Sequence, residues 1–138
     1  MSGNLLLNGR LAVDVWSVLL ATPIEQLGPD PCYEMTRRAL ASVGVLLPET
    51  AAAGLNAQES LFRVVGCNAP LRPFDVLVIR GHERPHLGVV VSLFRVLHTF
   101  SGGAVRIDPV RPFLAGGKVD RVLRAKALGE REPAGEPQ

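Results

Sequence analysis

The fold of this chain is decided by residues 76–110, which read VLVIRGHERPHLGVVVSLFRVLHTFSGGAVRIDPV. Four short runs within it are rich in β-branched residues, and glycine, proline or charged residues separate them. That pattern is typical of strands joined by tight turns. The stretch therefore predicts an antiparallel meander with strands at 76–80, 86–91, 95–100 and 105–107. Two histidines, His86 and His98, fall on neighbouring strands of it.

A helix with a clear start is predicted upstream of the meander. Asp30 suits the N-cap, and Pro31 suits the first helical position, where its missing N–H costs nothing. The helix would run from Cys32 to about Val43, with Gly44 as a natural stop. Its apolar positions recur at helical spacing and form one stripe, made of Cys32, Met35, Ala39 and Val43.

The other segments are less decisive. Apolar residues between positions 11 and 20 favour a helix that ends at Thr22-Pro23, although a strand also fits. Residues 58–65 suit a short helix or a strand equally, and 119–124 read as a last strand. Helices followed by a sheet predict an α+β domain. We expect an arm at residues 1–10, the domain at 11–124 and a flexible tail at 125–138.

Composition narrows the function. The chain has 138 residues, enough for one domain with a sizeable core. Its formal charge is +2, and its basic residues are scattered, so we do not expect nucleic-acid binding. We expect no signal peptide, since the N-terminus lacks a basic start followed by a long apolar run. No run is long enough to cross a membrane, so synthesis and folding in a cytoplasm are expected.

Cysteine and histidine suggest one chemical constellation. Cys32 falls in the first turn of its helix, where the dipole and free N–H groups favour a thiolate. A buried structural cysteine is the alternative for Cys32 alone. His86 and His98 can face the same side of paired strands and come close. Together the three supply a nucleophile, a base and an orienting group, as cysteine catalysis requires.

A zinc site is the competing interpretation, and the sequence disfavours it. Residues 82–86 spell HERPH, which matches the H-E-x-x-H zinc pattern. That pattern works on a helix, whereas Pro85 lies inside the motif and strands flank it. Cys67 with His82 and His86 lacks the paired spacing of a metal site. We therefore expect neither metal nor cofactor, and a disulfide between the two cysteines, Cys32 and Cys67, is left open.

Four motifs follow one another along the chain: DPCY at 30–33, PFDVL at 73–77, HLGVV at 86–90 and RVLH at 95–98. Their order resembles that of the NlpC-type family of papain-like cell-wall cysteine peptidases. Family members are similar in having an Asp-Cys pair at a helix start, a Pro-Gly-Asp strand start and a His-x-Gly strand. A third polar residue, often histidine, lies on the following strand. The resemblance covers residues 11 to 124 and implies a papain-like fold.

The resemblance also implies roles for the three residues. Cys32 would be the nucleophile, His86 the general base and His98 the orienting residue. The substrate would be a peptidoglycan stem peptide, attacked through a thioester, with the Cys32 N–H as an oxyanion donor. The short chain resembles the family's phage tail-tip members. Its expected place is therefore the virion, with other tail-tip and hub proteins as partners and without membrane insertion.

Several positions depart from the family pattern. Pro31 separates Asp30 from Cys32, Tyr33-Glu34 replaces a small residue and glycine, and Phe74 replaces the glycine before Asp75. A carboxylate close to the thiol, as at Glu34, disfavours a thiolate. These departures favour an alternative, in which the chain is a catalytically weak or inactive structural subunit of a tail tip. A cytosolic α+β binding domain is the third hypothesis.

Overall fold

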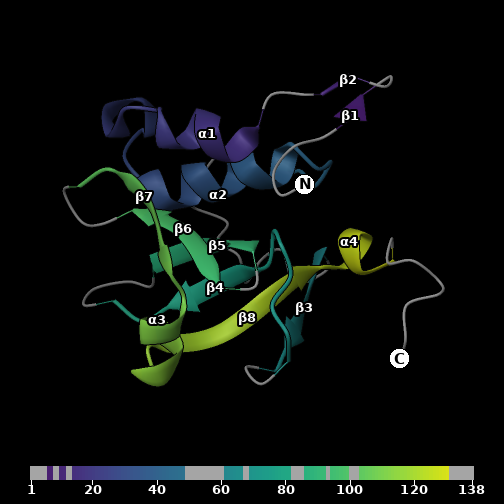
Figure 1. Ribbon diagram of the computed structural model, residues 1–138, viewed down its shortest axis with the longest axis vertical. Coiled ribbons are helices and arrows are strands. Elements are labelled where there is room, and N and C mark those ends of the chain that lie inside the picture. Colours follow the sequence, from purple (N-terminus) through teal and green to yellow (C-terminus); the bar gives the residue numbers. More distant parts are fainter. Residues whose placement is uncertain are drawn as a thin grey trace.

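The chain folds as a layer of helices on one face of a six-stranded antiparallel sheet (Figure 1). The computed structural model describes residues 6–7, 10–11, 14–48, 61–66, 69–81, 86–92, 94–99 and 103–130. The strands of the sheet are β3 (Phe62–Val65), β4 (Val76–Ile79), β5 (His86–Ser92), β6 (Arg95–Thr99), β7 (Val105–Pro109) and β8 (Val119–Ala125). Their order across the sheet is β3-β8-β4-β5-β6-β7, which confirms the α+β class.

The predicted meander is present. Strands β4, β5, β6 and β7 pair in sequence order, each antiparallel to the next. The predicted last strand is also present as β8, but its place is unexpected. It lies between β3 and β4, so it pairs with two strands that precede it by 40 residues or more. The undecided stretch at 58–65 ends in β3.

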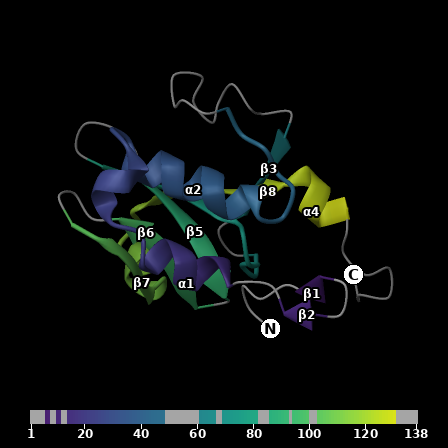
Figure 2. The same cartoon turned by 90° about the horizontal axis from the view of Figure 1, so that it is seen from above.

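The helix layer consists of α1 (Val15–Leu20), the 3-10 turn η1 (Ile24–Leu27) and α2 (Pro31–Ala41). Figure 2 shows α1 and α2 side by side over the sheet. Helix α1 begins later than its apolar pattern suggested. Asp14 caps it by accepting a hydrogen bond from the Trp16 N–H at 3.0 Å. Before it, β1 (Leu6–Leu7) pairs with β2 (Arg10–Leu11) as a short hairpin, so Leu11 belongs to a strand.

Gly44 stops α2 as predicted. Its φ of +85° is the left-handed conformation that glycine adopts without a Cβ clash. The Val45 N–H then reaches back to the Leu40 carbonyl, and the Gly44 N–H to the Ala41 carbonyl. These two bonds form a Schellman motif, in which the last carbonyls of the helix are satisfied.

Two further helices are short. Arg111–Ala115 forms α3, where the sequence suggested only a crossing, and its Pro112 lies in the first turn, where proline is tolerated. Lys126–Glu130 forms α4, at the start of the predicted tail. Residues 82–85 and 131–138 lie outside the described part of the chain. None of the described helices combines the length and apolarity that a membrane crossing requires.

Both faces of the sheet are buried, and the side chains of each face belong to a separate hydrophobic cluster. The helix-side face packs under α1 and α2 and includes Val76, Val78, Leu87, Val89, Leu97 and Leu123. The α3-side face is the opposite one and includes Leu77, Ile79, Val90, Val96 and Val122. Along each strand the two sets alternate, as the period of two requires. This alternation decides where each predicted site residue points.

Candidate functional site

Cys32 lies where the sequence predicted, in the first turn of α2. Pro31 occupies the first turn with it, and the side chain of Cys32 is half-buried against the helix-side cluster. Asp30 is the N-cap residue by position, but its carboxylate makes no capping bond to the helix. It accepts instead a hydrogen bond from the Cys32 Sγ at 3.6 Å. Only a protonated thiol can donate that bond.

His86 and His98 share one face of the sheet, as predicted. Ile79 is the cross-strand partner of His86, and Ile79 belongs to the α3-side cluster. Val96 also belongs to that cluster, and His98 follows it by two residues on the same strand. Since residues two apart point to the same face, both imidazoles face the α3 side.

Buried His98 contacts Asp108 and Phe113 on the α3 side. Its Nε2 lies 2.7 Å from Asp108 Oδ2, and its ring meets Phe113 of α3 edge-on at 5.2 Å between centroids. Arg106 holds the other carboxylate oxygen of Asp108 at 3.2 Å. The Asp108 carboxylate and the Phe113 ring therefore orient the His98 imidazole, and they do so on the face of the sheet away from α2.

The three predicted residues come from elements that meet at one end of the molecule. Figures 1 and 2 place the first turn of α2 over the end of the sheet at which β5 begins and β6 ends. The side chains nevertheless diverge. At that end the helix-side positions belong to Leu87 and Thr99, which are buried under the helices. Cys32 thus packs on the helix side while both imidazoles lie on the opposite face, and the catalytic roles stay predictions.

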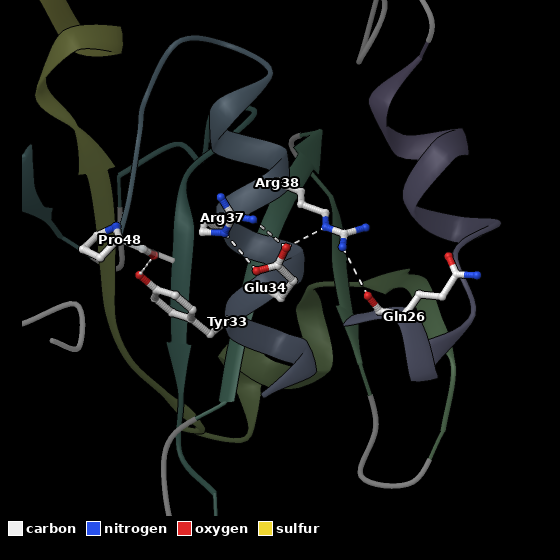
Figure 3. A network of polar contacts seen from close by, with 6 residues as sticks. All are labelled: Gln26, Tyr33, Glu34, Arg37, Arg38 and Pro48. Atoms are coloured by element: carbon white, nitrogen blue, oxygen red, sulfur yellow. Dashed lines mark hydrogen bonds and ion pairs between the residues drawn. The ribbon is translucent and has the colours of Figure 1, made fainter. Parts of the chain in front are cut away.

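The negative charge of Glu34 is neutralised by two arginines, Arg37 and Arg38. Both of its oxygens bind Arg37, at 2.8 and 2.7 Å, and Oε2 also binds Arg38 Nε at 2.7 Å (Figure 3). Hydrogen bonding from Arg37 is the largest cause that lowers the pKa of Glu34. Arg38 extends the network to the Gln26 carbonyl of η1 at 3.2 Å. The carboxylate therefore ties α2 to η1, and its charge is neutralised locally.

Sequence reasoning missed a buried ion pair. Arg124 of β8 donates from Nε and Nη2 to the two carboxylate oxygens of Asp75, at 2.9 and 2.8 Å. The Arg72 N–H and the Pro70 carbonyl complete the network at 2.9 and 3.1 Å. The available signal was a charged residue beside apolar ones, with Asp75 just before the VLVI run and Arg124 just after Leu123. Nothing in the sequence alone indicated that these two strands are neighbours.

Metal binding finds no support in the described residues. His86 opens a strand, so it does not share a helix face with His82, which lies with Cys67 outside the described ranges. Among the residues that are described, no group of three or more His, Cys, Asp or Glu side chains could hold a metal ion.

Comparisons with known proteins assign neither a family nor a function to this chain. No family model matches the sequence, and no curated protein matches it either.

Proposed function

We propose that this chain is a catalytically inactive NlpC-type domain that serves as a structural subunit of a phage tail tip. The observation that carries the proposal is the strand register. It directs His86 and His98 to the α3-side face, whereas Cys32 packs on the helix side. A cysteine nucleophile needs an imidazole within hydrogen-bond reach. At the end of the sheet where β5 begins and β6 ends, the helix-side positions hold Leu87 and Thr99 instead.

The papain-like part of the proposal is supported by the backbone at Phe74. This residue stands where the family has glycine, and its φ of +74° lies in the left-handed region that favours glycine. A glycine would adopt this backbone without strain, which fits a family pattern that has glycine at this position. Helix α2 starts beside Cys32, and the β4–β7 meander follows in the order that the resemblance implies.

The contact between Cys32 and Asp30 also supports the proposal that the domain is inactive. The Asp30 carboxylate lies 3.6 Å from the Cys32 Sγ, and repulsion between two negative charges opposes a thiolate there. His98 is already engaged by Asp108 and packed on Phe113, so it would have to leave both to act elsewhere. A structural role asks only that the fold present its surfaces to neighbouring subunits.

The peptidase is the second candidate, and the position of Cys32 favours it. The residue is partly exposed in the first turn of an eleven-residue helix, above the strand ends that carry both histidines. A one-residue slip of β5 or β6 would bring an imidazole to the helix side. This candidate therefore requires a different register from the one observed.

Thiol chemistry and wall hydrolysis separate the two candidates. For the inactive subunit, Cys32 in the full chain is alkylated by iodoacetamide at pH 7 no faster than glutathione, with Cys67→Ser as the background. Incubation with peptidoglycan fragments then releases no new amino groups. Fast alkylation, together with amine release that is lost in Cys32→Ala and His86→Ala, would establish the peptidase instead.

The tail-tip role needs its own experiment. Phage carrying Cys32→Ala in this chain should assemble and infect at the wild-type titre. Deletion of residues 1–10 or 131–138 should reduce assembled tails. Normal tails from both deletions, or none from Cys32→Ala, would contradict a purely structural role.

A further inference from the structure

We infer that α1 is a strap that undocks from the sheet in a separate step, before the rest of the domain unfolds. The inference concerns residues 15–20 and the contact that Trp16 makes with Phe74. It is independent of the proposed function. Three features decide how firmly α1 is docked: the Trp16 indole, the Phe74 turn on which it stacks, and the length of the helix.

The first feature is the indole of Trp16. The side chain is buried, with 3% of the residue exposed, yet its Nε1 has no hydrogen-bond acceptor among the described residues. A buried N–H without an acceptor loses the bond that water would give it. Undocking of α1 restores that bond, so the indole N–H favours the undocked state.

The second feature is the backbone of Phe74. Its φ of +74° is unfavourable for a residue with a Cβ, and a bulky ring makes the position unusual. The ring stacks on Trp16 with 4.8 Å between centroids and 29° between planes. The turn itself belongs to the sheet, because the Phe74 N–H donates to the Val90 carbonyl at 2.8 Å and Asp75 is paired with Arg124. The backbone strain therefore stays when Trp16 leaves, and only the stack is lost.

The third feature is the short length of α1. Six residues are too few for a helix that is stable on its own, so α1 depends on its packing. Only Trp16 and Leu19 are buried, whereas Val18 and Leu20 are 47% and 42% exposed. Helix α2, by comparison, has eleven residues, buries five of them and ends in a Schellman motif. The two helices therefore differ in how firmly they are held.

Undocking would open the helix layer at a defined place. Helix α1 packs against α2 and β7, at the β7 edge of the sheet. Its release exposes the part of the helix-side cluster near that edge, and α2 continues to cover β5 and β6. The strap thus controls access to one side of the core without loss of the sheet.

Fluorescence tests the inference directly, because Trp16 is the only tryptophan of the chain. In a urea titration of the full chain, we expect the Trp16 emission to shift at a lower urea concentration than the far-UV circular dichroism of the sheet. Hydrogen exchange should likewise be faster at the amides of α1 than at those of α2. Coincident transitions, with equal protection of the two helices, would overturn the inference.

Leu19→Ala and Leu97→Ala form a matched pair of variants, since both remove a buried leucine. If α1 has already left before the sheet unfolds, Leu19→Ala lowers the fluorescence midpoint and leaves the dichroism midpoint unchanged. Leu97→Ala, in β6, lowers the dichroism midpoint. A Leu19→Ala variant that shifts both midpoints equally would show that α1 unfolds with the sheet, and Leu19→Val serves if alanine prevents folding.

The strain at Phe74 has its own readout. Phe74→Gly and Phe74→Ala both remove the stack, but only glycine accepts the left-handed backbone freely. We expect the glycine variant to have the higher dichroism midpoint of the two. A higher midpoint for alanine would contradict the strain on which this step relies.

Discussion

Arg124 donates two hydrogen bonds to the carboxylate of Asp75, of 2.9 and 2.8 Å, and both side chains are almost completely buried. The pair joins β8 to the turn that precedes β4. Removing one partner leaves an unpaired charge in the interior, so we expect Asp75→Asn to destabilise the domain by about 3–5 kcal/mol. Chemical denaturation of the purified chain measures this loss.

The control for that variant is an exposed pair of the same kind. Arg80 and Asp120 lie 3.8 Å apart, with 69% and 51% of their side chains exposed. We expect Asp120→Asn to change the free energy of unfolding by less than about 1 kcal/mol, because water screens the pair. Equal losses for Asp75→Asn and Asp120→Asn would mean that the buried network contributes nothing special.

Gly88 is required by a close approach. A Cβ on this residue would lie 2.7 Å from Cγ2 of Val96, a stiff side chain in the adjacent strand. We expect Gly88→Ala to destabilise the domain by about 1–3 kcal/mol through overpacking. Gly66→Ala is the matched control, because nothing lies within 4 Å of the Cβ it would add. If Val96→Ala fails to rescue any of the Gly88→Ala loss, the cause lies elsewhere.

Glu34 makes the stability depend on pH. Arg37 and Arg38 lower the pKa of Glu34 in the folded chain, so folding is favoured by its ionised form. That contribution is fully present above the ordinary glutamate pKa and is lost as the pH falls through the lowered folded value. Glu34→Gln should therefore cost about 1 kcal/mol or less at pH 7, and the difference should vanish in acid. A difference that persists at pH 2 would refute the linkage.

Tyr33 makes the stability depend on pH in the alkaline range. Its ionisation can be followed by ultraviolet absorbance without overlap, because it is the only tyrosine. Its hydroxyl donates to the Pro48 carbonyl at 2.7 Å, and burial is the main cause that raises its pKa. Ultraviolet titration should therefore detect phenolate only above the ordinary tyrosine range. The proton stabilises the fold, so this contribution is lost as the pH rises through the raised value. A midpoint at or below 10 would exclude the buried phenol.

Local patterns predicted most elements of the fold. Pro31 and Gly44 marked the two ends of α2, and β-branched runs marked the meander, because caps and period-two patterns act within a few residues. The place of β8 was not predictable in this way. It depends on pairing between Val122 and Leu77, which lie far apart in the sequence. Pairing of that kind leaves no local signature.

The candidate site was predictable only in part. The shared face of His86 and His98 followed from their strands, and the register agrees. Which of the two faces they share was not predictable, since one residue of offset reverses it. The contact of His98 with Asp108 was equally hidden, because an aspartate at a strand end reads as a surface residue.

The position of β8 has a consequence during synthesis. Until residues 119–125 leave the ribosome, the VLVI strand at 76–79 has an unpaired, wholly apolar border. Such a border can recruit a strand from another nascent chain. Every interruption of translation before residue 119 should therefore yield insoluble product, whereas release after residue 125 should not. Ribosome-bound fragments of graded length would locate that threshold.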